Sequence, residues 1–265
     1  MTTSTMARSK RPPKCAELLL PPAFWLGVWQ LFAFFVDRHV QGRGNELLLP
    51  YPITVARALV RLAGSGTFWV TAAASLGRIL LGLAAGTGLG VLLAWAVYRS
   101  PWADRLLSPA LRVIRATPVA SFILLVLLWT GKNAVPAIIS GLMVLPVVWA
   151  NLVRGLGETD PKLLELARAY RFSRWKTARL VYLPSLRPYF LSAVTTALGL
   201  AWKSGVAAEV LCIPRAAIGT RIYESKLYLE IPDLFAWTAV VVALSLLLEG
   251  VLRRVLARWK GGTVE

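Results

Sequence analysis

The strongest constraint on the fold is a series of long apolar runs that recur along the chain. The clearest run extends from Phe68 to Tyr98 and contains a single charged residue, Arg78. The runs are apolar on every side rather than along one stripe, so helices formed by them have no face suited to water. A helix needs about 20 consecutive apolar residues to cross the hydrocarbon core of a bilayer. The sequence therefore predicts an all-α polytopic membrane protein.

Composition and charge support a membrane protein and disfavour a nucleic-acid-binding protein. Hydrophobic residues make up 57% of the 265 residues and charged residues only 16%, whereas a soluble domain carries about 25% charged residues. The net charge is +17, but the basic residues gather at the ends of the apolar runs. They are therefore assigned to the membrane surface and not to nucleic acid. Cys15 and Cys212 are too few for a disulfide framework.

Six spans account for the apolar runs. We predict them at about 18–36, 68–98, 111–130, 134–153, 185–212 and 234–252. Pro118 and Pro146 fall inside the third and fourth spans, where they predict kinks. Residues 51–63 predict a short amphipathic helix that lies at the membrane interface.

The distribution of Lys and Arg predicts the orientation. With the N-terminus inside, the inner segments hold twenty basic residues and the outer segments eight, and basic residues concentrate in cytoplasmic loops. Both termini are therefore predicted to be cytoplasmic. The expected organisation is a cytoplasmic tail at 1–17, a transmembrane domain at 18–256 with a cytoplasmic loop at 155–184, and a second tail at 257–265.

Three glycines recur every four residues in the second span, at Gly82, Gly86 and Gly90. This spacing places them on one helix face and predicts close approach of a neighbouring helix. The string GTGLG within this stretch is not a phosphate-binding loop, because no strand precedes it and no Lys-Ser or Lys-Thr follows.

The longest cytoplasmic loop, 155–184, contains a short helix by its pattern. Asp160 is suited to cap the helix and Pro161 to begin it. Four residues at helical spacing are expected to form one apolar stripe: Leu163, Leu164, Ala167 and Tyr170. Arg168 and Arg171 flank this stripe. A helix of this kind either docks on a partner protein or lies on anionic headgroups, and the pattern alone leaves both open.

The loop resembles the cytoplasmic signature of the permease subunits of bacterial ABC importers. Four residues match the signature at its spacing: Glu165, Ala167, Leu183 and Pro184. Val181 stands where the signature has isoleucine, which is a conservative exchange. Leu166 replaces an Ala, and Arg171 replaces a Gly that would end the helix in the left-handed conformation. Because that conformation costs Arg about 1 kcal/mol, we expect a turn of different shape or a longer helix.

The resemblance extends over about 48–255 and is strongest to permeases of the nitrate/sulfonate/taurine type. It implies a type I ABC importer permease fold in a bacterial cytoplasmic membrane and transport of a small anionic or polar solute, with a pyrimidine vitamin precursor as the alternative. The implied partners are a second permease subunit, expected to be an identical copy, two ATPase subunits that dock on the loop helix, and an external binding protein. The chain itself is expected to bind no cofactor and no metal, since ATP and Mg²⁺ belong to the ATPase. In agreement, it lacks a G-x-x-x-x-G-K-[ST] loop.

Four ionisable residues within predicted spans are functional candidates, because charge is costly in the membrane: Arg78, Lys203, Glu209 and Glu249. Lys203 suits a pathway for an anion, or else pairs with a carboxylate of another helix. Glu209 either lines the pathway or anchors the loop that follows. Arg78 is expected to be structural, and Glu249 to pair with Arg253 four residues on.

Two rival functions remain to be weighed. A membrane enzyme is disfavoured because the single histidine, His39, has no metal partner at recognisable spacing and no nucleophile lies beside a base. A secondary transporter would work without an ATPase partner, which the sequence alone does not exclude.

Overall fold

The computed structural model describes residues 14–39 and 48–261, and every regular element in these ranges is helical. Most of the predicted tails, 1–17 and 257–265, lies outside the described residues. The elements in chain order are α1 (Lys14–His39), α2 (Pro52–Ala63), α3 (Gly66–Arg99), α4 (Pro101–Ala116), α5 (Val119–Trp129), α6 (Val135–Gly157), α7 (Pro161–Ala169), α8 (Arg174–Thr177), η2 (Ala178–Tyr182), α9 (Leu183–Cys212), α10 (Ile218–Leu227) and α11 (Ile231–Gly261).

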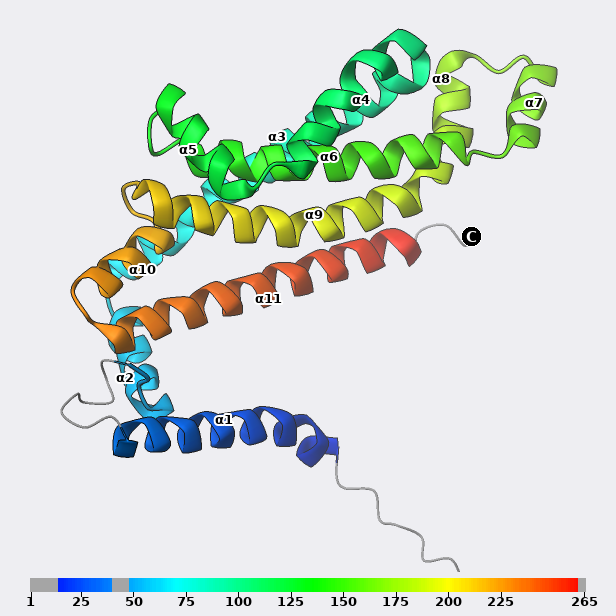
Figure 1. The fold of residues 1–265 in the computed structure, drawn as a ribbon. Coiled ribbons are helices and arrows are strands. Elements are labelled where there is room, and N and C mark those ends of the chain that lie inside the picture. The colour runs from blue at the N-terminus through cyan, green and yellow to red at the C-terminus, as the bar shows by residue number, and fades with distance from the viewer. Residues whose placement is uncertain (1–13, 40–47, 262–265) are drawn as a thin grey trace, which may run out of the picture.

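The core of the molecule is a layer of long helices with α6 between α3 and α9. Figure 1 shows α11 running beside α9, with α7 and α8 at one end of the long helices and α10 at the other. The first residues of α1 and the last of α11 lie at the end that carries α7. The main apolar cluster includes Ile79, Val148 and Trp202, all at most 2% exposed.

Backbone contact between α3 and α6 depends on the three regularly spaced glycines. A methyl group added to Gly82 would lie 2.8 Å from the Cβ of Ser140, and one added to Gly86 would lie 2.8 Å from the Cα of Gly141. A methyl group on Gly90 would lie 2.9 Å from the Cβ of Val148. The glycines therefore let the two helices approach more closely than any larger side chain would permit.

Four described helical segments are long and apolar enough to cross a membrane: 20–39, α3, α6 and 231–256. The pair α4 and α5 passes the same test only when the two helices are taken together. The count of six spans therefore stays a prediction: the four segments would be joined by the α4–α5 pair and by α9.

The predicted third span is not one kinked helix, and this expectation was wrong. α4 ends at Ala116, α5 begins at Val119, and the two are bent by 109°. Thr117 is extended, with ψ of 134°, because the ring of Pro118 disfavours helical geometry in the residue before it. Pro118 thus precedes the first turn of α5 instead of kinking a continuous helix. Pro146, by contrast, lies inside α6 as expected.

α9 is 30 residues long but is not among the described helices with a stretch apolar enough to cross a membrane. Its buried face is built from small residues, among them Ala193, Ala197 and Ala201, each fully buried. A helix that packs within a bundle needs less apolar surface than one that faces lipid on several sides. Its position among α3, α6 and α11 explains why the helix exists without a long apolar run.

The amphipathic segment 51–63 forms α2, as predicted. Val55 and Ala58 bury its apolar face against Ala236 of α11. Arg61 donates a hydrogen bond to the carboxylate of Asp233, which joins α2 to the first turn of α11.

The α3–α6 contact can be tested with Gly86→Ala. We expect this change to lower the free energy of unfolding by roughly 1–3 kcal/mol, because the added methyl group forces the backbones apart. Thermal denaturation in detergent would measure the loss. Gly88→Ala is the matched control, since nothing lies within 4 Å of its added Cβ; equal stability of the two variants would contradict the packing role.

Candidate functional site

The short helix α7 begins at Pro161, as its sequence predicts. The Asp160 side chain accepts a hydrogen bond of 2.9 Å from the backbone N–H of Lys162, and Pro161 is the first helical residue. This cap satisfies a backbone donor that the first turn leaves free. A nine-residue helix is thereby fixed outside the bundle of long helices.

The end of α7 corrects the expectation of a differently shaped turn or a longer helix. Arg171 adopts the left-handed conformation, with φ of 51°. The N–H of Phe172 donates to the carbonyl of Ala167 at 2.8 Å, and the N–H of Arg171 donates to that of Arg168 at 3.0 Å. This pair of bonds is the Schellman motif. The turn therefore has the geometry that a glycine would give it, formed here by an arginine.

The predicted single apolar stripe of α7 is divided between two faces. Leu164 and Ala167 face inward and line a cavity, and Ala167 is only 3% exposed. Leu163 and Tyr170 face outward instead, and Leu166 joins them at helical spacing. The outward face is thus an exposed apolar stripe at one end of the molecule. It is formed by Leu163, Leu166 and Tyr170, which are 42%, 52% and 70% exposed.

The remaining signature residues lie in η2 and at the start of α9. Val181 is buried within η2, whereas Leu183 and Pro184 begin α9 and are exposed. Glu165 lies on the exposed surface of α7. The loop therefore presents both its apolar stripe and the end of the signature at the same end of the bundle.

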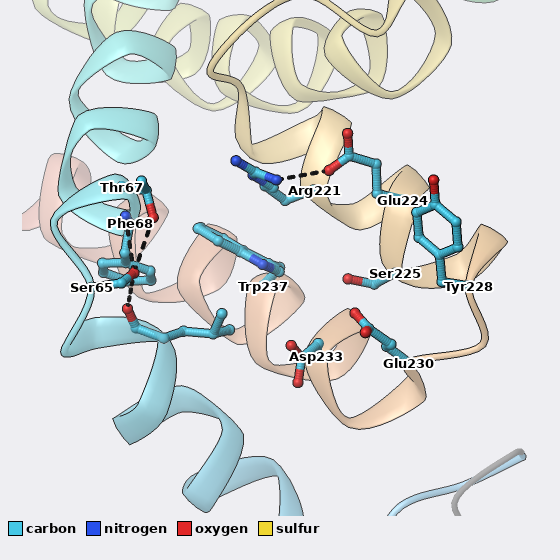
Figure 2. A pocket seen from close by; sticks show the side chains of 11 residues that line it. Ser65, Thr67, Phe68, Arg221, Glu224, Ser225, Tyr228, Glu230, Asp233 and Trp237 are labelled. Carbon is cyan, nitrogen blue, oxygen red and sulfur yellow. Dashed lines mark hydrogen bonds and ion pairs between the residues drawn. The ribbon is translucent and has the colours of Figure 1, made fainter.

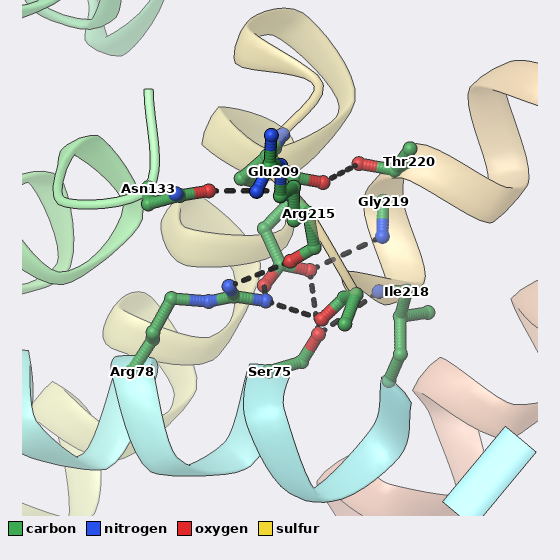
Figure 3. Close-up of polar contacts among 10 residues, drawn as sticks. Ser75, Arg78, Asn133, Glu209, Arg215, Ile218, Gly219 and Thr220 are labelled. Atoms are coloured by element: carbon green, nitrogen blue, oxygen red, sulfur yellow. Dashed lines mark hydrogen bonds and ion pairs between the residues drawn. The ribbon is translucent and has the colours of Figure 1, made fainter. Parts of the chain in front are cut away.

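Glu209 lies in a buried network, which corresponds to the anchoring alternative (Figure 3). Its carboxylate is fully buried and accepts hydrogen bonds from Ser75 Oγ at 2.9 Å, the backbone N–H of Gly219 at 3.1 Å and Arg78 Nη2 at 3.2 Å. These donors come from α3 and α10, so one side chain of α9 joins three helices. Three hydrogen bonds and an opposite charge are what a buried carboxylate requires.

Arg78 extends this network to the loop between α9 and α10. It donates to the carbonyls of Arg215 at 3.0 Å and Ala216 at 2.7 Å. Ile213 and Ala216 in this loop have φ of 50° and 46°, and left-handed backbone of this kind persists only when its surroundings hold it. The sequence did not identify the Arg78–Glu209 pair, although an isolated Arg and an isolated Glu in two separate apolar runs are a signal for one.

Lys203 has a different environment from Glu209. It lies on the exposed face of α9, and no ion pair to it is found among the side chains that the structure describes, those of 20–39 and 48–256. The carboxylates considered as partners are engaged elsewhere: Glu209 with Arg78, and Glu249 with Arg253 at 3.7 Å. The structure thus brings Glu209 together with Arg78 and leaves Lys203 apart from both.

A polar cavity of about 320 Å³ lies at the other end of the bundle, where α10 and α11 meet the start of α3 (Figure 2). Its lining contains three carboxylates, those of Glu224, Glu230 and Asp233. Two of them are paired, with Arg221 at 2.9 Å and with Arg61. No cluster of three or more His, Cys, Asp or Glu suited to a metal ion occurs in the described part of the chain.

Comparison with known proteins places the chain among transport permeases. The family model of the binding-protein-dependent transport system inner membrane component matches residues 86–261. A Bacillus subtilis (strain 168) permease named for aliphatic sulfonates transport is 27% identical over 91% of this chain and 87% of its own length. The taurine transport system permease protein of Escherichia coli K12 is 28% identical, with 82% of each chain covered. The bicarbonate transport system permease protein of Synechococcus elongatus is 27% identical over 89% of this chain and 87% of its own.

A solved structure agrees on the fold. The chain superimposes on a subunit of a bacterial ABC transporter involved in the import of the acidic polysaccharide alginate with a TM-score of 0.63. The match covers 92% of this chain and 95% of that subunit at 15% sequence identity.

The cost of the left-handed conformation of Arg171 can be tested with Arg171→Gly. We expect α7 to be stabilised by about 1 kcal/mol, because glycine adopts the left-handed conformation without steric cost. Hydrogen exchange of the α7 amides would then slow by about fivefold. Ala169→Gly, inside the same helix, should instead speed exchange. If Arg171→Gly also speeds exchange, the Arg side chain stabilises the turn and the strain argument fails.

Proposed function

The chain belongs to the family of binding-protein-dependent transport system inner membrane components, and from this premise we propose how its parts work in transport. It is a permease subunit of an ABC importer with the type I permease fold. We propose that two copies form the translocation pathway and that ATPase subunits bind the α7 end. A binding protein on the opposite side delivers a small anionic solute.

The observation that carries the ATPase assignment is the outward stripe of α7. Three exposed apolar side chains, on a short helix capped at both ends, form a rigid projection (Leu163, Leu166 and Tyr170). An apolar helix face of this kind is suited to a groove on a partner protein. The basic residues around it support a cytoplasmic location for this end, where α1 begins and α11 ends.

Lys203 supports an anionic substrate. The exposed face of α9 around it is mixed in character, with Thr196 and Ala207 but also Leu200 and Leu211, which are 41% and 47% exposed. A charged ammonium group at hydrocarbon depth is costly unless it meets water or an opposite charge. A water-filled pathway along this face of α9 is therefore supported by the charge of Lys203 itself. Relatives are named for sulfonate, taurine and bicarbonate transport, and each of these solutes has an anionic group, although taurine also carries an ammonium group.

The docking proposal can be tested with Leu166→Asp in the complete transporter. The added charge would be desolvated in an apolar groove, so we expect ATP-driven uptake to fall by about tenfold or more. Uptake and ATP hydrolysis would be measured together in proteoliposomes. Arg179→Gln, an exposed change in the same loop, serves as the control. Leu166 is a sharper choice than Ala167, whose burial means that a bulky residue would disturb the loop itself.

Uptake that persists in Leu166→Asp would contradict the docking role. Uptake by the wild-type chain without any ATP-binding subunit would instead favour a secondary transporter and overturn the proposal as a whole.

The substrate proposal predicts that Lys203→Met raises the apparent KM for an anionic solute by about tenfold, since one charge-assisted contact is lost. Lys203→Arg retains the positive charge and should restore most of the affinity. Uptake of a sulfonate across a concentration series would separate KM from the maximal rate. An unchanged KM in Lys203→Met would remove Lys203 from the pathway.

A further inference from the structure

A cavity of about 310 Å³ lies under the inward face of α7. Its walls come from α7, from the segment formed by α8 and η2, and from the last turns of α3. Leu164 and Ala167 close it on the α7 side. None of the transport steps proposed above uses this cavity.

One wall of the cavity is aromatic. Trp95, Tyr98 and Tyr182 contact one another, with ring centroids 5.8 to 6.2 Å apart. The hydroxyl oxygens of Tyr98 and Tyr182 lie 3.1 Å apart. Each hydroxyl has one hydrogen to donate, so the pair shares one hydrogen bond and retains a second donor for a ligand. Aromatic side chains with a polar tip are typical of the membrane–water boundary.

Three arginines also line the cavity: Arg99 at the end of α3, Arg168 on α7 and Arg174 on α8. The lining contains no carboxylate. None of the three guanidinium groups forms an ion pair within the described residues. Among the nearby acidic groups, Glu158 pairs with Arg154 at 2.8 Å and Asp160 caps α7. Glu165, three residues before Arg168, is exposed and does not line the cavity.

Two of these arginines, Arg99 and Arg168, act on the pKa of Tyr182. Burial and the hydrogen bond to Tyr98 raise the pKa of Tyr182 to about 12, while the charges of Arg168 and Arg99 act in the opposite direction. Both guanidinium groups are therefore close enough to act on the same hydroxyl. Three like charges around one small space repel one another, and an anion would relieve this repulsion.

We propose that this cavity binds a phosphate-bearing anion, held by Arg99, Arg168 and Arg174 and by the tyrosine hydroxyls. The planar fork of arginine matches the oxygens of a phosphate group and is preferred for this ligand. The phosphate can come from an anionic phospholipid headgroup or from a free phosphate in solution. Basic pockets at the cytoplasmic ends of membrane helices are suited to the former.

The position of the site gives the anion a regulatory role. α7 packs directly on η2, while Arg168 on α7 and Arg99 on α3 face the same cavity. An anion between them ties the proposed docking helix to a membrane helix. This role rests on the proposed ATPase docking, but the binding itself does not, so the two can fail separately.

The test uses the full-length chain without ATPase subunits, reconstituted in nanodiscs of phosphatidylcholine with or without phosphatidylglycerol. A parallel sample in neutral detergent receives inorganic phosphate. Thermal denaturation and native mass spectrometry would report stabilisation and retained lipid. The variant is Arg99→Gln with Arg168→Gln, and the matched control is Arg179→Gln, which lies in the same loop outside the cavity.

We expect phosphatidylglycerol to raise the melting temperature of the wild type and of Arg179→Gln. The double variant should lose this shift and bind the lipid at least about tenfold more weakly. Stabilisation by phosphatidylglycerol alone identifies a lipid headgroup, and stabilisation also by inorganic phosphate identifies a free anion. Should the double variant fail to fold, Arg99→Lys with Arg168→Lys retains the charge and should show weakened but measurable binding.

Two results would overturn the proposal. One is equal stabilisation of the wild type, the double variant and the control by phosphatidylglycerol, which would show a general charge effect. The other is no response of the wild type to either anion, which would show that the three arginines hold no phosphate-bearing ligand.

Discussion

The fold depends on how closely α3 and α6 approach each other. Two apolar helices in a bilayer gain little from the hydrophobic effect, because lipid tails are as apolar as their side chains. Their association relies on packing, and here glycines at 82, 86 and 90 remove the side chains that would keep the backbones apart. Because α9 packs on both α6 and α3, the α3–α6 contact belongs to one three-helix arrangement. It also brings Ser75 and Arg78 of α3 within reach of Glu209, so the polar network depends on a contact made by residues without side chains.

Much of this arrangement could be predicted from local patterns. Helix packing at the glycines, the start of α7 at Pro161 and the amphipathic α2 each depend on residues within a few positions of one another. Such signals are local because a cap or a helix face is defined by one or two turns. The family resemblance was visible for the same reason, since the loop signature lies within twenty residues of sequence, from Glu165 to Pro184.

Features that depend on tertiary contacts could not be predicted. Arg78 and Glu209 are 131 residues apart in sequence, and no periodicity indicates which charge in one span meets which charge in another. For Arg171, the sequence shows only the free-energy cost of the left-handed conformation to one residue. The two Schellman hydrogen bonds and the burial of Ala167, which offset this cost, become visible only in the structure. The cavity arginines, Arg99 and Arg168, also lie far apart in sequence, so each separately indicated only membrane topology.

The junction between α4 and α5 has a mechanical consequence. Within the described residues no backbone hydrogen bond joins the two helices: the N–H of Thr117 is bonded back to Val113, and that of Ser121 to Pro118. Rotation about this junction therefore breaks no backbone bond, and the resistance to it comes from side chains, since Ile123 and Val126 of α5 are buried against α6 and α9. α5, with 11 residues, is only about 16 Å long, roughly half the thickness of the hydrocarbon core. The angle between α4 and α5 is thus set by side-chain packing on the neighbouring helices, in contrast to the α3–α6 contact, where the backbones themselves meet.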